Sequence, residues 1–195
     1  MKKPILAIVL SVVLLLGLSL GLRGVAQKRA QAEHLWLMQT LLPGSESFTK
    51  ESYTGEDATI TGVHKSENGF VIETRTHGYA DEITVVVGVS NAGKVTGLVV
   101  LEAHETLGLG SRILTDHEFL SQFLNSSGDF AVATQGEADA FSGATGTTSN
   151  AEAVVTVDGI SGATVSSKAV IRCVNSAVAY VTGADTSSGA TSWGG

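Results

Sequence analysis

The stretch Glu82–His104 reads "EITVVVGVSNAGKVTGLVVLEAH", with runs of β-branched residues on both sides of a short polar turn. Valine and isoleucine favour extended backbone, and "SNAG" is typical of a tight turn. The stretch therefore predicts a β-hairpin between Glu82–Val89 and Lys94–His104. Two earlier runs, Ala58–Lys65 and Gly69–Ala80, predict strands on either side of a "SENG" turn. Neighbouring hairpins of this kind predict an antiparallel sheet.

Helical patterns lie before and after these strands. Residues Ala30–Leu42 are good helix formers and precede a Pro-Gly stop. Residues Thr115–Asn125 place their apolar side chains at helical spacing, with Thr115 or Asp116 as the N-cap. A third helix is predicted from Val165 to Val181, before a terminating glycine. The predicted fold is therefore α+β, with flanking helices on one antiparallel sheet.

The N-terminal segment Pro4–Leu22 contains no charged residue. At 1.5 Å per residue, its 19 residues would span about 28 Å, close to the hydrocarbon thickness of a bilayer. The run is longer than the apolar part of a cleaved signal peptide, about 7–15 residues. The segment therefore predicts a single-pass transmembrane helix. Basic residues flank it on both sides, so the positive-inside rule does not decide its orientation.

These patterns divide the chain into four parts. Residues 1–29 form the membrane anchor and its flanks, and 30–57 a juxtamembrane helix with a linker. One folded domain is expected over 58–183, followed by a Gly/Ser-rich tail over 184–195. Within the domain, 126–150 is rich in Ser, Gly and Ala and contains little apolar side chain to bury. We therefore expect it to be a loop or an insertion.

Composition excludes several classes of protein. The net charge of −7 argues against a nucleic-acid-binding surface, which needs an excess of Lys and Arg. The single cysteine, Cys173, excludes an internal disulfide and a cysteine-ligated metal site. Its apolar neighbours predict a buried structural thiol. The five histidines show no paired i, i+4 spacing, so we expect neither a metal site nor a catalytic residue that acts alone.

The pattern Asp-x-x-Ser-Gly-Ala-Thr occurs three times, at Asp139–Thr145, Asp158–Thr164 and Asp185–Thr191. Only the middle copy follows a strand-like run and precedes a predicted helix. Its small-residue turn would therefore lie at a helix N-terminus, where unpaired N–H groups and the helix dipole favour a phosphate. An ordinary N-cap is the competing interpretation, and it is the commoner role of such a turn.

The middle copy, "DGISGATVSSKAV" over 158–170, resembles the flavinylation motif of FMN-binding domains. In that family a flavin transferase links the phosphate of FMN to the last Thr or Ser of the motif. The stretch Gly78–Ile113 resembles the second signature of the same family, including "HETLGLG" over 104–110. Leu107 stands where the family pattern has proline. Together with the N-terminal apolar segment and the length, the chain resembles the G subunits of Rnf-type electron transport complexes, over roughly residues 35–181.

The resemblance implies a covalent FMN on Thr164. It also implies further cofactor-binding residues in the two motifs: Asp158, Ser161, Gly162, Ala163, Ser166 and Lys168 in one, and Glu105, Thr106, Leu107, Gly108, Leu109 and Gly110 in the other. Thr145 and Thr191, in the other two copies of the pattern, stay open as additional acceptors.

The resemblance further implies an electron-carrying subunit of a membrane-bound, ion-translocating oxidoreductase. Its partners would be the other membrane subunits and a flavin transferase, and its FMN domain would lie on the extracytoplasmic side of the cell membrane. One alternative is a stand-alone extracytoplasmic flavoprotein carrier or reductase. Others are the C-type component of the related sodium-translocating NADH:quinone reductases, and a tethered structural domain without redox activity. The coupled ion, the electron donor and the direction of electron flow stay open.

Overall fold

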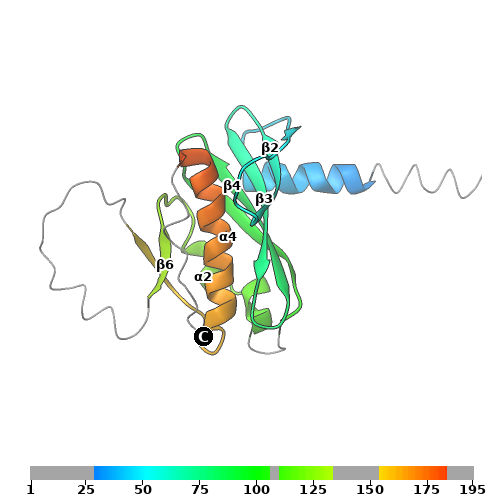
Figure 1. Ribbon diagram of the computed structural model, residues 1–195. Helices are drawn as coiled ribbons and strands as arrows, with labels where there is room; N and C mark the ends of the chain where they lie inside the picture. Colours follow the sequence, from blue (N-terminus) through cyan, green and yellow to red (C-terminus); the bar gives the residue numbers. More distant parts are fainter. Residues whose placement is uncertain (1–28, 106–109, 134–153, 184–195) are drawn as a thin grey trace, which may run out of the picture. The chain divides into compact units, whose positions relative to one another are not determined.

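The computed structural model describes residues 29–105, 110–133 and 154–183 (Figure 1). The chain divides into two units, Met1–Leu37 and Met38–Gly195. A helix covers 29–41, as the sequence predicts for Ala30–Leu42. The later elements, all in the second unit, are β1 (Thr49–Glu51), β2 (Ile60–Lys65), β3 (Gly69–His77), β4 (Glu82–Ser90), β5 (Val95–Ala103), the 3₁₀ helix η1 (Gly110–Leu114), α2 (His117–Ser121), β6 (Phe130–Ala133), β7 (Val155–Asp158) and α4 (Thr164–Thr182).

Strands β1 to β5 form one antiparallel sheet in the order of the sequence. β3 pairs with β4 along its whole length, from Gly69 opposite Ser90 to His77 opposite Glu82. β4 pairs with β5 from Val89 opposite Val95 to Ile83 opposite Ala103. Each strand therefore lies beside its neighbour in the chain, and the predicted hairpins and antiparallel sheet are confirmed.

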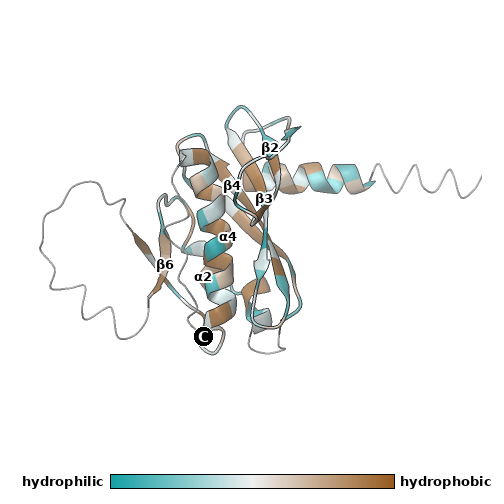
Figure 2. Ribbon diagram, in the orientation of Figure 1, coloured by the Kyte–Doolittle hydropathy of each residue, from teal (hydrophilic) through white to brown (hydrophobic). Residues whose placement is uncertain are grey.

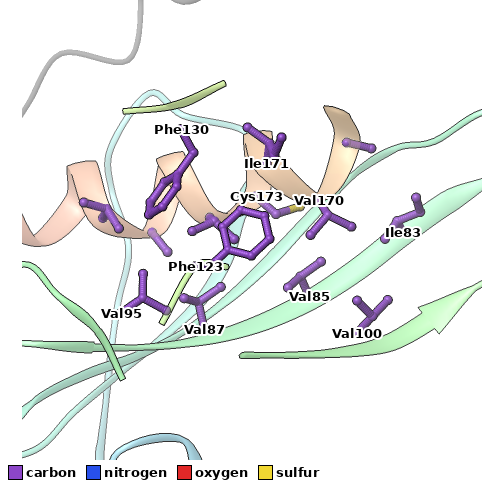
Figure 3. Packing of buried hydrophobic residues seen from close by; sticks show 14 of the residues in the cluster. Ile83, Val85, Val87, Val95, Val100, Phe123, Phe130, Val170, Ile171 and Cys173 are labelled. Atoms are coloured by element: carbon purple, nitrogen blue, oxygen red, sulfur yellow. The ribbon is translucent and has the colours of Figure 1, made fainter. Parts of the chain in front are cut away.

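One face of this sheet packs against α4 (Figure 1). Alternate residues of β4, among them Ile83, Val85 and Val87, are fully buried in one apolar cluster with Cys173 and Val174 of α4 (Figure 3). Figure 2 shows the strands beside α4 as mostly hydrophobic, whereas α4 itself has both hydrophobic and hydrophilic positions. Burial of this surface is the main favourable contribution to folding. The prediction of a buried, unpaired Cys173 is confirmed.

The opposite face of the sheet contains two glycines in register, Gly88 of β4 and Gly97 of β5. The backbone at Leu41 approaches both of them: a Cβ atom on Gly88 would collide with the Leu41 carbonyl oxygen. Thr96 Oγ1 donates a hydrogen bond of 2.6 Å to that same oxygen. The missing side chains therefore let the segment around Leu41 lie directly on the sheet.

The predicted helix over Thr115–Asn125 is shorter in the structure. α2 begins after the N-cap Asp116, whose carboxylate accepts a 3.0 Å hydrogen bond from Phe119 N, and it ends at Ser121. The chain then turns, because Asn125 N donates to Val95 O at 2.8 Å and Ser126 O accepts from Val95 N at 3.0 Å. Contacts with β5 therefore override the local helical pattern.

Strand β6 lies inside 126–150, where the sequence predicted a loop or an insertion. It pairs in parallel with β7, from Phe130 opposite Val155 to Ala133 opposite Asp158, and this second sheet was not predicted. The Phe130 ring lies 5.2 Å from that of Phe123, and the Asn175 side chain bonds to both Phe130 N and Phe130 O at 2.9 and 3.0 Å. These distant partners explain the strand. Residues 134–150 lie outside the described part of the chain.

Helix α4 runs from Thr164 to Thr182 and ends at Gly183, whose φ is +73°. This agrees with the predicted helix and its terminating glycine. The predicted transmembrane segment Pro4–Leu22 lies outside the described residues. Within the described residues, every helix is too short or too polar to span a bilayer.

Candidate functional site

A tight turn connects β7 to α4. Ala163 N donates a 2.9 Å hydrogen bond to Ile160 O, and Gly162, between them, has a φ of +79°. A positive φ at the third position is the mark of a type II turn, which favours glycine because that residue lacks a Cβ. The Ser-Gly-Ala sequence of the motif therefore has a structural reason at Gly162.

The start of α4 has no side-chain cap. The N-cap is Ala163, and no side chain accepts a hydrogen bond from the first turn of the helix there. The interpretation of this motif as an ordinary capping sequence is therefore wrong. Uncapped N–H groups at a helix start can bind an anion instead. Thr164, the first residue of the helix, is exposed beside them.

The two serines that follow are buried and fix the turn in place. Ser166 Oγ donates a 2.9 Å hydrogen bond to Glu105 Oε2. Ser167 Oγ accepts a 3.0 Å hydrogen bond from Ile160 N, which holds the turn against the helix. Ser167 was not among the predicted site residues. Its signal in the sequence is a pair of adjacent serines just after the start of an amphipathic helix.

Glu105 connects three segments that are far apart in the sequence. Its Oε1 accepts hydrogen bonds from Tyr79 N at 2.8 Å and Ala80 N at 3.4 Å, in the turn between β3 and β4. Its Oε2 accepts from Ser166 of α4. Only 8% of the residue is exposed. Glu105 therefore joins the β3–β4 turn, the end of β5 and the start of α4.

A cavity of about 430 Å³ lies where these segments meet. Its volume falls within the range of small-molecule and cofactor sites, about 300–1,000 Å³. It is lined by residues of both predicted motifs and of the β3–β4 turn: Tyr79, Glu105, Gly110, Gly162, Ala163, Thr164, Val165 and Ser166. The two motifs, which are far apart in the chain, therefore form one site.

The structure places the predicted site residues in three groups. Those that line the cavity are Gly162, Ala163, Thr164, Ser166, Glu105 and Gly110. Asp158, Ser161 and Lys168 are exposed nearby and do not line it. Thr106, Leu107, Gly108 and Leu109 lie outside the described residues, as do Thr145 and Thr191.

Asp158 is the last residue of β7, and its backbone is held by one side chain. Asp158 N donates to Gln122 Oε1 at 2.8 Å, and Gln122 Nε2 donates to Asp158 O at 3.2 Å. Within the described part of the chain, the Asp158 carboxylate has no hydrogen-bond partner. The acidic group of the motif is therefore presented to solvent at the entrance to the turn.

Two cavity residues were missed by the sequence analysis. Tyr79 is 69% exposed and Val165 is 36% exposed, although both are large and apolar. An exposed aromatic residue in a short turn is unusual enough to suggest contact with a ligand or a partner. Tyr79 also lies at the start of the stretch Gly78–Ile113, which was the available signal.

The groups whose pKa departs from its ordinary value are not among the cavity residues. Burial raises the pKa of the Cys173 thiol from 9.0 to about 11. Burial would also raise the pKa of Asp57, but hydrogen bonds from Ser176 and from Thr59 lower it by more. Burial, followed by the charge of Glu51, raises the pKa of Tyr180. These shifts belong to the core and to the sheet edge.

Comparison with known proteins bears directly on these motifs. The family model of the FMN-binding domain matches residues 78–179, just over half of the chain. The G subunit of the ion-translocating oxidoreductase complex of Methanosarcina acetivorans is 34% identical over 156 residues, which cover 74% of this chain and 72% of that protein. The G subunit of the Na⁺-translocating ferredoxin:NAD⁺ oxidoreductase complex of Acetobacterium woodii is 32% identical over 111 residues, 56% of this chain and 47% of that protein.

Two solved structures are also similar. One is the C-type component of the Na⁺-translocating NADH-quinone reductase of Parabacteroides distasonis, with a TM-score of 0.44, 22% identity and coverage of 63% of this chain and 60% of that one. The other is NqrC of Shewanella oneidensis, with a TM-score of 0.45, 18% identity and coverage of 75% and 73%. The extent of the family match and the identity to the Methanosarcina protein are decisive: this chain belongs to the FMN-binding domain family, among the G subunits of ion-translocating oxidoreductase complexes.

Proposed function

We propose that this chain is the flavin-bearing electron carrier of an Rnf-type, ion-translocating oxidoreductase complex. The observation that carries the proposal is the single cavity formed by the two family motifs, with the exposed Thr164 at its edge. The curated relatives are named as G subunits of such complexes, one of them a Na⁺-translocating ferredoxin:NAD⁺ oxidoreductase. The chain acts as one subunit of the translocase, and we expect no complete oxidoreductase activity from it alone.

The cofactor of this site is FMN, and its residues fit that group. The cavity has the volume of a cofactor site, Gly162 lets the backbone approach a ligand closely, and the helix start offers uncapped N–H groups to a phosphate. Tyr79 and Val165 offer exposed apolar surface to a flat aromatic ring. When bound, the flavin supplies the capacity to accept electrons from one redox centre and pass them to another.

The flavin is attached covalently through its phosphate to Thr164. In this step the O–H bond of the threonine breaks and a bond forms between Oγ and the phosphorus. A P–O bond to the leaving group of an activated flavin nucleotide breaks, and the proton leaves with the displaced group. The flavin transferase supplies the activated donor and the catalysis. The exposure of Thr164 supports the proposal, because an enzyme must reach the hydroxyl.

The tethered phosphate keeps one negative charge, at the positive end of α4. Such a charge at a helix N-terminus is worth about 0.3–1 kcal/mol when exposed to solvent. Lys168, exposed on the second turn of the helix, adds a positive charge nearby, and Asp158 and Ser161 present polar groups to the transferase. These residues are therefore recognition residues of the motif, around the acceptor itself.

The membrane placement is part of the same proposal. The apolar segment Pro4–Leu22 anchors the chain with a single span, and the domain over 58–183 lies on the extracytoplasmic side. A covalent tether suits a domain outside the cytoplasm, because a lost FMN would have no cytosolic pool from which to be replaced. The anchor also keeps the carrier close to its partner subunits and raises their effective concentration.

The intact mass of the full chain, co-expressed with its flavin transferase, tests the covalent proposal. We expect the wild type to carry one FMN and to fluoresce in a denaturing gel, and Thr164→Val to lose both signals. Thr156→Val is the matched control, because Thr156 is an exposed threonine eight positions earlier and outside the cavity lining. Residual flavin on Thr164→Val would place an acceptor elsewhere, with Thr145 and Thr191 as the first candidates.

Purification from the native membrane separates the complex subunit from the alternatives. A component of the complex brings other membrane proteins with it in mild detergent, whereas a stand-alone carrier or reductase is purified alone. A colourless protein at the bare polypeptide mass, made together with its transferase, would instead indicate a structural domain without redox activity.

A further inference from the structure

We propose that Glu105 is the residue that lowers the reduction potential of the flavin, by placing a fixed, buried negative charge in the cavity wall. The inference rests on the proposed function, since it concerns the flavin in that cavity. The family resemblance implied only that Glu105 binds the cofactor. The structure instead gives both of its carboxylate oxygens to partners within the protein.

The contacts of Glu105 are those of an ionised carboxylate. It accepts from Tyr79 N, from Ala80 N and from Ser166 Oγ, so that its described partners are donors. An ionised carboxylate is an acceptor only, and several such donors favour the charged form over the neutral one. Within the described residues, no lysine, arginine or histidine forms an ion pair with it. Its charge is therefore stabilised by dipoles and not cancelled by a cation.

The fold reserves space for this carboxylate. A Cβ atom on Gly110 would lie 2.7 Å from Glu105 Oε2 and 2.9 Å from Ser166 Oγ. A Cβ atom on Gly78 would collide with Glu105 Oε1. A side chain at either glycine would therefore displace the carboxylate from its donors. Two glycines on different segments, together with the serine, fix the position of one charge.

The effect on the flavin follows from electrostatics. Two electrons added to a flavin ring leave it more negative unless two protons enter with them. A fixed negative charge at the cavity wall opposes this addition, and it acts more strongly in a buried site than in water because the local dielectric constant is lower. Glu105 therefore shifts the potential in the negative direction. As a positioning residue it also holds the β3–β4 turn and the start of α4 around the ring.

The decisive experiment is a redox titration of the flavin-loaded full chain, with dithionite as the reductant and the flavin absorbance as the signal. We expect Glu105→Gln to move the midpoint potential in the positive direction. Glu102→Gln is the matched control: it removes the same charge from the same strand region, but the Glu102 side chain is 57% exposed and the residue lies outside the cavity lining. Its potential should equal that of the wild type.

Equal potentials for Glu105→Gln and Glu102→Gln, in proteins that both carry flavin, would overturn the proposal. If Glu105→Gln takes up no flavin, Ser166→Ala decides in its place. That change removes one donor and keeps the carboxylate, so the charge is less compensated and the potential should become more negative. A potential that is unchanged or more positive would contradict the proposal. If neither variant takes up flavin while Glu102→Gln does, Glu105 serves assembly of the site and the proposal is wrong.

These outcomes differ from a failure of the proposed function. If the wild type itself carries no flavin after co-expression with the transferase, the function is wrong and the role of Glu105 falls with it. If the wild type is loaded and only the potentials fail to differ, the electron-carrier function stands and the role of Glu105 alone is rejected.

Discussion

Single residues of this site depend on backbone conformation as much as on side-chain chemistry. Gly162 adopts a φ of +79° in the turn before α4 and lines the cavity, so the motif needs glycine there for two reasons. The turn and its Thr164 could be predicted from the sequence because these features are local. Ser167 and Tyr79 could not, because their roles depend on contacts that no local pattern displays.

We expect Gly162→Ala to destabilise the fold and to reduce flavin attachment. A left-handed conformation costs a non-glycine residue about 1–2 kcal/mol. Gly183→Ala is the matched control, because Gly183 has a φ of +73° at the other end of α4 and its Cβ would meet open space. Urea unfolding should show similar losses for both variants, whereas the intact mass should show reduced flavin only in Gly162→Ala. Full loading of Gly162→Ala would contradict a role for this backbone in the site.

Among the elements, the strands were predicted well and the connections between them less well. β2 to β5 each contain their own β-branched run and are joined by short polar turns, so local information is sufficient. The end of α2 and the strand β6 depend instead on contacts between Asn125 and Val95, and between Phe130 and Asn175, which are distant in the chain. The two motifs meet for a similar reason, since Glu105 and Ser166 are 61 residues apart.

The paired glycines of β4 and β5 give a prediction at this scale. Gly88→Ala should lower the free energy of unfolding by about 1–3 kcal/mol, because the new Cβ would overlap the backbone at Leu41, which has no side-chain freedom with which to yield. In the control Gly62→Ala, the new Cβ would lie 3.0 Å from Glu73 Oε2, the movable end of a side chain, so the change should cost far less. Urea denaturation of both variants measures the difference. Equal stabilities would show that the segment at Leu41 is not held against the sheet.

At the scale of the whole molecule, one apolar cluster joins the sheet, α2, β6 and α4. Cys173 lies fully buried in this cluster, and its thiol therefore reports on the integrity of the entire fold (Figure 3). The sequence predicted this burial from the apolar neighbours in one helix. It did not predict the consequence for titration, which depends on the sheet and its Thr74 beside the thiol.

Alkaline unfolding tests that consequence. The pKa of Cys173 is raised from 9.0 to about 11 in the folded protein, mainly because burial disfavours the thiolate. The folded state therefore holds its proton where the unfolded state has lost it, and stability falls as the pH rises from 9 towards 11. A shift of this size corresponds to about 3 kcal/mol at most. Urea unfolding between about pH 8 and 11 should show a steeper loss of stability for the wild type than for Cys173→Ala. Tyr180, whose pKa is also raised, titrates in both proteins and cancels in the comparison. Parallel pH profiles would mean that the thiol is reached by water in the folded state, and that the interface between α4 and the sheet is looser than its packing indicates.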